Sequence, residues 1–239
     1  MIEPLELLFG KYGFEIDYIK QIVTGAKYSA VMLKNGNIGV CANLGNKVNT
    51  KKSNYTNLDL KNYSHRIVLN AYFTALLNYA VKYKIGDIFE EIEFNKFNNI
   101  TMIGLFKPLV EIFQRYGIPL TVFDYKKSDT ILTSMSEQEQ TLEKADAVIL
   151  TSTSIFNLTF TNILDDINDN CDIFMLGPSS IMAEEILQYR NIKMIFGSTF
   201  DKFDERVLKI IDNDGGTRKF LKIGQKRITI FGEMNENLS

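Results

Sequence analysis

Histidine and cysteine are scarce in this sequence, which limits the metal chemistry open to it. The 239 residues include one histidine and two cysteines. A zinc site needs several such ligands at short spacing, and that set is absent. A Ser-His-Asp triad would have to use His65, which opens a helical pattern far from any nucleophile motif, so we interpret it as a first-turn residue. Cys41 and Cys171 lie among apolar residues and are predicted to be buried free thiols.

Long apolar runs and an excess of one charge are also missing. No stretch is long enough to span a bilayer and no basic segment precedes an apolar one at Met1, so we expect a cytoplasmic protein. The 27 basic and 29 acidic residues nearly balance, which argues against a nucleic-acid-binding surface. Hydrophobic residues make up 45% of the chain, enough for the core of one large or two modest domains.

The glycine-rich nucleotide motifs are absent as well. The segment Gly104-Leu105-Phe106-Lys107 has one glycine where the dinucleotide fingerprint needs three, so the standard mode of NAD binding is not expected. No P-loop sequence is present either, which excludes phosphoryl transfer of that type.

The first part of the chain predicts a small α+β unit. A short helix is expected over residues 4–17, and strands over residues 27–33 and 37–42 flank Asn35-Gly36, a pair typical of tight hairpin turns. A polar loop follows at residues 46–57. Apolar residues then recur at helical spacing from residue 67 to residue 83, which predicts a long amphipathic helix.

From residue 100 the pattern predicts a Rossmann-like domain with a parallel sheet. Apolar runs at residues 100–103, 120–123, 147–150, 173–176 and 193–196 alternate with helical patterns, as in βαβ units. Pro108 and Gly117 bracket one helix, and Ser136 with Glu139 forms a candidate capping box. A last strand is expected at residues 226–231. The predicted fold class is therefore α/β, with a small α+β domain at residues 1–95 and a Rossmann-like domain at residues 96–239.

Two loops rich in hydroxyl groups follow strands of this predicted sheet. They are Thr151-Ser152-Thr153-Ser154, before a helix expected near Asn157, and Gly177-Pro178-Ser179-Ser180, which is expected to open the next helix. Ligands bind beyond the carboxyl ends of parallel strands, and helix N-termini attract anions. Ordinary capping by serine and threonine is the alternative. We expect the two loops to converge on one hollow that faces the smaller domain. Gly215-Gly216-Thr217 is interpreted as a helix stop.

These segments in this order resemble the DUF364 family, described as "putative heavy-metal chelation", with its DUF4213 N-terminal domain. The resemblance rests on residues 103–110, residues 145–157, the loop Leu176-Gly177-Pro178-Ser179, Gly197 with Asp204, and the helix at residues 71–78. It implies an enolase-N-terminal-like first domain on a Rossmann-like second domain, with a site in the crevice between them. The chain departs from the family pattern at Ser152, where glycine is usual, and at Lys107, near a common proline.

The first functional hypothesis is the binding of a small anionic ligand or a metal complex in the interdomain crevice, in heavy-metal chelation or metal-cofactor metabolism. Oxygen donors without histidine or cysteine suit hard cations, or a metal already held by an organic chelator. The cofactor considered is accordingly a metal ion or a metal-chelate complex. The predicted ligand-binding residues are Gly104, Phe106, Asp124, Thr151, Ser152, Thr153, Asn157, Gly177, Pro178, Ser179 and Gly197. The candidate metal ligands are Asp124 and Asp204, for which a solvated loop acid and a helix first-turn acid are the alternatives.

Two further hypotheses stay open. One is a transferase with a nucleotide-like cofactor such as S-adenosylmethionine, in which Asp124 would bind a ribose. The other is a non-catalytic partner protein in metal uptake or cofactor assembly, which a large exposed apolar patch would favour. No catalytic residue is predicted, and whether the protein is an enzyme is left open. We expect a small-molecule or metal-complex ligand, no nucleic acid and no membrane, with a homo-oligomer as an open alternative.

Overall fold

The computed structural model describes residues 1–125 and 128–230 of the chain. Its strands are β1 Ile19–Thr24, β2 Tyr28–Leu33, β3 Ile38–Ala42, β4 Lys84–Ile85, β5 Ile100–Ile103, β6 Thr121–Phe123, β7 Ala147–Thr151, β8 Asp172–Leu176, β9 Ile192–Thr199 and β10 Gln225–Ile230. Its α-helices are α1 Pro4–Tyr12, α2 Tyr63–Leu77, α3 Ile88–Glu91, α4 Lys107–Tyr116, α5 Gln138–Leu142, α6 Thr153–Phe156, α7 Phe160–Asp166, α8 Glu184–Leu187, α9 Glu205–Asp212 and α10 Thr217–Phe220.

A seven-stranded sheet runs through the centre of the molecule in the order β4-β10-β9-β8-β7-β5-β6. The five strands from β9 to β6 are parallel, whereas β10 and β4 are antiparallel to their neighbours. The predicted Rossmann-like parallel sheet is therefore confirmed. The strand order reverses between β5 and β7, because β6 lies on the other side of β5.

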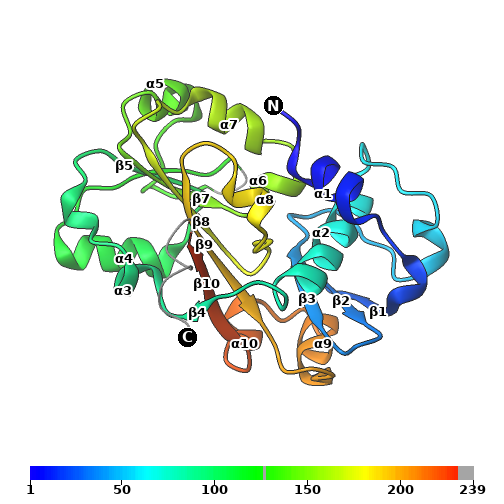
Figure 1. Ribbon diagram of the computed structural model, residues 1–239. Coiled ribbons are helices and arrows are strands. Elements are labelled where there is room, and N and C mark those ends of the chain that lie inside the picture. The colour runs from blue at the N-terminus through cyan, green and yellow to red at the C-terminus, as the bar shows by residue number, and fades with distance from the viewer. Residues whose placement is uncertain (126–127, 231–239) are drawn as a thin grey trace.

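Both faces of this sheet are covered, as the apolar strands require. Along β7, Val148 and Leu150 belong to one core cluster, and Ala147 and Ile149 belong to another. The first cluster includes residues of α5, α6, α7 and α8, and the second includes residues of α3 and α4. Figure 1 shows these two groups of helices on opposite sides of the sheet.

The three-stranded antiparallel sheet β1-β2-β3 is also covered on both faces, by two helices that are far apart in the sequence. Val31 and Leu33 pack in the core that contains α2. Ala30 and Met32, on the other face, pack in a core that contains Leu208 and its neighbours in α9. Figure 1 shows α2 on one side of the small sheet and α9 on the other.

The packing crosses the predicted division at residue 95 in both directions. Strand β4 pairs with β10 at the edge of the large sheet, and Ile88 of α3 packs in the core under that sheet. Conversely, α9 completes the core of the small sheet. Each sheet therefore depends on the other part of the chain: the large sheet takes β4 from before residue 95, and the small sheet is covered by α9 from after it.

Several expected elements differ from the observed ones. The first helix ends at Tyr12, because Gly13 takes a positive φ, and a strand not predicted, β1, follows. The capping box at Ser136 is wrong: Ser134 caps this turn, accepting the Ser136 N–H at 3.4 Å. The hairpin at Asn35-Gly36 and the helix stop at Gly117 are confirmed. The last strand is described to residue 230, so its predicted final residue lies outside the described part. Within that part, no helix has the length and apolar character needed to cross a membrane.

Candidate functional site

The loops after β5, β6 and β7 meet where the strand order of the large sheet reverses. Open parallel sheets bind their ligands at such a switch point, beyond the carboxyl ends of the strands. We call this region the switch-point loops and define it as Gly104–Phe106, Asp124–Tyr125 and Thr151–Asn157. It contains seven of the predicted ligand-binding residues, which are Gly104, Phe106, Asp124, Thr151, Ser152, Thr153 and Asn157.

Gly104 joins the first two of these loops to the third. Its φ is +93°, and its N–H donates to the carbonyl oxygen of Phe123 at 2.7 Å. The next N–H, of Leu105, donates to the Asp124 carboxylate at 2.9 Å. A Cβ atom at residue 104 would lie 2.8 Å from Cβ of Thr151. Only glycine allows this approach, which brings the Asp124 and Thr151 loops to one place.

Hydroxyl groups line the third loop. The Oγ1 atoms of Thr151 and Thr153 are 3.0 Å apart, and both side chains are half-buried. Asn157 donates from Nδ2 to the hydroxyl of Tyr125 at 3.3 Å, which links this loop to the end of β6. Burial raises the pKa of Tyr125, and the charge of Asp124 adds to the effect. The phenol is therefore a neutral donor at neutral pH.

The predicted helix starts in these loops need correction. Helix α6 spans only Thr153–Phe156, inside the first loop, and the next helix, α7, begins at Phe160, three residues after Asn157. The second loop does not open a helix, because α8 begins only at Glu184. With α6 only four residues long, the proposed anion binding at helix N-termini loses its structural basis in both loops.

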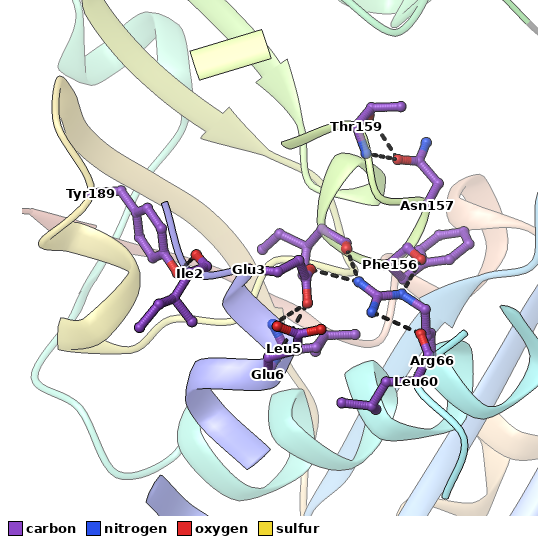
Figure 2. A network of polar contacts seen from close by, with 11 residues as sticks. Ile2, Glu3, Leu5, Glu6, Leu60, Arg66, Phe156, Asn157, Thr159 and Tyr189 are labelled. Atoms are coloured by element: carbon purple, nitrogen blue, oxygen red, sulfur yellow. Dashed lines mark hydrogen bonds and ion pairs between the residues drawn. The ribbon is translucent and has the colours of Figure 1, made fainter. Parts of the chain in front are cut away.

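A buried arginine fixes the end of α6. Arg66 has no exposed surface and donates to the carbonyl oxygens of Phe156 at 2.6 Å and Ile155 at 2.7 Å. A third bond, 2.5 Å long, joins it to the carboxylate of Glu3, as Figure 2 shows. Our sequence analysis did not single out Arg66, because it follows Ser64 and His65 in the polar first turn of α2, where an arginine is unremarkable. Because Asn157 directly follows this anchor, Arg66 positions one edge of the switch-point loops.

The Gly177–Ser179 loop lies at the same edge of the sheet but faces the small sheet. Ser179 is 1% exposed, and its hydroxyl accepts the N–H of Ala42 at 3.0 Å. Its carbonyl accepts from Asn70 of α2 at 2.9 Å. Packed side chains thus occupy the space at Ser179, and the hollow that we expected it to share with Thr153 is not formed there. Pro178, beside it, is half-buried.

The remaining predicted glycines have packing roles. A Cβ atom at Gly177 would lie 2.7 Å from Oγ of the buried Ser152, and one at Gly197 would lie 3.0 Å from Met182. Phe106 is half-buried and packs against the core that contains α4. Ser152, where the family pattern has glycine, therefore fills space under the neighbouring loop.

The two candidate metal ligands lie far apart. Asp124 follows β6 and Asp204 precedes α9, beyond β9, which is four strands away. Four strand spacings amount to about 19 Å, too far for one metal ion. The Asp204 carboxylate caps α9 and pairs with Arg206 at 2.6 Å, and this hydrogen bond lowers its pKa. In the described residues no group of three or more His, Cys, Asp or Glu side chains could hold a metal.

The histidine and the two cysteines, which are the soft metal-binding residues of the chain, are hydrogen-bonded or buried. Nδ1 of His65 accepts the N–H of Asp59 at 2.9 Å. Both cysteines are buried and free, as predicted, and burial raises the pKa of Cys41 and raises that of Cys171 to about 12. Soft metal ions prefer thiolate and imidazole donors, so these residues do not fit a bare heavy-metal ion. The switch-point loops supply oxygen donors and backbone amides instead.

Comparisons with known proteins agree with this fold. Two crystal structures of DUF364 proteins of unknown function match it: one from Pyrococcus horikoshii at 20% identity and a TM-score of 0.75, the other from Desulfitobacterium hafniense at 18% and 0.74. Each match covers 95% of this chain and 96% of the other. No curated protein matches. The model of the DUF364 family, described as "Putative heavy-metal chelation", matches residues 87–230. With that match spanning more than half of its length, the chain belongs to the DUF364 family.

Proposed function

We propose that this protein binds a small metal chelate, a metal ion held by an oxygen-rich organic anion, at the switch-point loops. Two contacts of neighbouring residues carry the proposal: Gly104 packs against Thr151 of the Thr151–Thr153 hydroxyl pair, and the N–H of Leu105 donates to the Asp124 carboxylate. Hydroxyl groups donate to anionic oxygens, and a carboxylate attracts a cation or metal-bound water. A chelate presents both kinds of group, whereas a simple anion would be repelled by Asp124.

The family description, heavy-metal chelation, is compatible with this proposal only if the metal arrives already complexed. The buried thiols and the hydrogen-bonded His65 offer no soft donors at the site. The proposal therefore treats the chelate as cargo or substrate and assigns no catalytic residue. It places the protein in the cytoplasm, where free thiols stay reduced.

Thermal unfolding with defined probes tests the proposal. Ferric citrate should raise Tm in a concentration-dependent way, because a ligand that binds only the folded state stabilises it by about 2.7 kcal/mol at one hundred times Kd. Citrate alone and Zn²⁺ alone should give smaller shifts. Thr153→Val should remove the shift, while the exposed Thr50→Val is the matched control and should keep it.

Ser179→Ala separates binding from packing. Its hydroxyl accepts a buried backbone N–H, so we expect a loss of about 1–3 kcal/mol in unfolding free energy, while the rise in Tm with ferric citrate stays unchanged.

Equal rises in Tm for wild type and Thr153→Val, or no rise with any chelate, would refute the proposed site. If no small molecule raises Tm, a non-catalytic role with a protein partner or in a homo-oligomer becomes the working proposal.

One observation favours a second candidate, a transferase with an adenosyl cofactor. Asp124 ends the second parallel strand and accepts the N–H of Leu105 in the first loop, which is where such folds bind a ribose. S-adenosylhomocysteine should then raise Tm, and Asp124→Asn should abolish that shift. A shift with ferric citrate and none with the adenosyl compound would decide for the first proposal.

A further inference from the structure

Three side chains with large apolar parts are exposed beside the switch-point loops. Tyr63 is 43% exposed, Tyr125 is 54% exposed and Leu158 is 40% exposed. Tyr63 is the first residue of α2, Tyr125 lies in the loop after β6, and Leu158 lies in the loop after α6. Exposed apolar side chains that gather in one region mark a surface that contacts a ligand or a partner. We call these three residues the apolar rim.

Contacts within the structure place the apolar rim next to the proposed ligand-binding residues. Nδ2 of Asn157 donates to the Tyr125 hydroxyl at 3.3 Å, and Leu158 directly follows Asn157. Burial raises the pKa of Tyr125 most, and Tyr63 lies close enough to add to this effect. One turn after Tyr63 on α2, Arg66 donates to the carbonyl oxygen of the residue before Asn157 at 2.6 Å (Figure 2). The three side chains of the rim therefore surround the Asn157 end of the switch-point loops.

Leu158 holds a backbone conformation that favours glycine. Its φ is +66°, and it directly follows the residue that caps the end of α6. The N–H of Thr159 donates to the carbonyl oxygen of Ser154 at 3.2 Å, the bond that closes a helix end at which glycine is the usual residue. Leu158 belongs to none of the core clusters formed by the described residues. The fold thus carries a strained, exposed leucine that its cores do not use, which indicates a role in binding.

We propose that the apolar rim binds a hydrocarbon group of the chelator, so that the ligand of the switch-point loops is the metal complex of an amphiphilic organic anion. The inference rests on the proposed function and adds to it the chemical class of the chelator. The rim and the polar loops adjoin at Asn157, which bonds to Tyr125 and precedes Leu158. One ligand therefore places its oxygen atoms at the loops and its hydrocarbon group on the rim.

The hydrophobic effect sets the size of the expected preference. Each methylene group that leaves water on binding strengthens the complex about fourfold. Citrate carries no alkyl chain, so ferric citrate occupies only the polar part of the site. A chelator with an alkyl chain should therefore bind more tightly than a chelator that has the same oxygen donors and no chain.

Calorimetric titration of the intact protein with two ferric hydroxamates tests the inference. Ferric acetohydroxamate and ferric hexanohydroxamate present the same oxygen donors, but the alkyl chains of the second are longer. The hexanohydroxamate complex should bind at least about tenfold more tightly, as burial of about two methylene groups requires. Equal affinities would overturn the inference and leave the proposed function standing. Binding of neither complex would also overturn it, and the rise in Tm with ferric citrate then decides separately on the proposed function.

Leu158→Gly separates a binding role from a structural one. It should bind ferric hexanohydroxamate about fivefold more weakly than wild type and ferric acetohydroxamate equally well. Its Tm should equal or exceed that of wild type, because glycine accepts the positive φ at this position. Ile85→Ser is the control: Ile85 is 67% exposed on β4, at the opposite edge of the large sheet from β6, and the variant should bind both complexes like wild type. An unchanged affinity of Leu158→Gly for the hexanohydroxamate complex, or an equal loss with both complexes, would overturn the inference.

Discussion

Replacing Arg66 with methionine tests whether a buried cation holds the end of α6 in place. The arginine is wholly buried and donates to the carbonyls of Ile155 and Phe156 and to the carboxylate of Glu3. Methionine keeps much of the volume but leaves these acceptors without their donor. Breaking a buried ion pair by removing one partner costs about 3–5 kcal/mol, and we expect a loss of that size in the free energy of unfolding.

Thermal and urea unfolding followed by circular dichroism measure this loss. At this chain length about 1 kcal/mol corresponds to 2–4 °C, so Tm should fall by about 6–20 °C. Arg115→Met, on the exposed surface of α4, is the control and should change stability by no more than about 0.5 kcal/mol.

A double variant identifies the cause of the loss. Glu3→Gln removes the charge that Arg66→Met leaves unpaired, so the two substitutions together should cost less than the sum of their separate effects. Glutamine keeps an oxygen that can cap α1, where Glu3 accepts the N–H of Leu5 at 3.1 Å. Arg66→Met with the stability of the control, or strict additivity with Glu3→Gln, would refute the reasoning.

Three further predictions follow from burial, backbone conformation and charge. Ellman's reagent should leave Cys41 and Cys171 unmodified in the native protein and modify both in guanidinium, because both thiols are buried with raised pKa values; fast modification of the native protein would contradict this. Gly104→Ala should lower the free energy of unfolding in urea by about 1–3 kcal/mol, since φ is +93° and the new Cβ would meet Thr151; an unchanged midpoint would contradict it. Burial is the largest influence on the pKa of Glu185 and acts to raise it, but hydrogen bonds from its lysine and tyrosine partners outweigh burial, so the pKa in the folded protein is lowered. The carboxylate therefore stabilises the fold above the unfolded pKa of 4.5, and this stabilisation is lost as pH falls through the folded pKa. Glu185→Gln should therefore be less stable than wild type at pH 7, with the difference narrowing towards pH 3; a constant difference would argue against this role.

The parallel sheet could be predicted because each of its strands is a short apolar run between helical patterns. The predicted strand at residues 100–103 coincides with β5, and the carboxyl ends of all five parallel strands lie at the expected edge. Strand β1 was missed because its burial does not alternate: residues 20 and 21 are both exposed, next to an irregularity in its pairing with β2. Periodicity cannot reveal a strand whose register shifts.

The candidate site could be predicted only as far as the sheet edge. Adjacent strands guaranteed that the loops at Thr153 and Ser179 would lie near each other. Their side chains then diverge, because Ser179 pairs with Ala42 of β3, a partner distant in sequence. The same holds for Arg66, whose two carbonyl acceptors belong to α6, about ninety residues later in the chain. Contacts of this kind depend on tertiary packing, which no local pattern encodes.

The sharing of elements between the two sheets has a consequence during synthesis. The face of β1–β3 that α9 covers stays open to solvent until Glu205–Asp212 has left the ribosome. At about 5–20 residues per second, the ribosome needs roughly 10–30 seconds to translate from the end of β3 to α9. During this interval the nascent chain exposes an apolar β-surface, a natural substrate for chaperones that act on growing polypeptides.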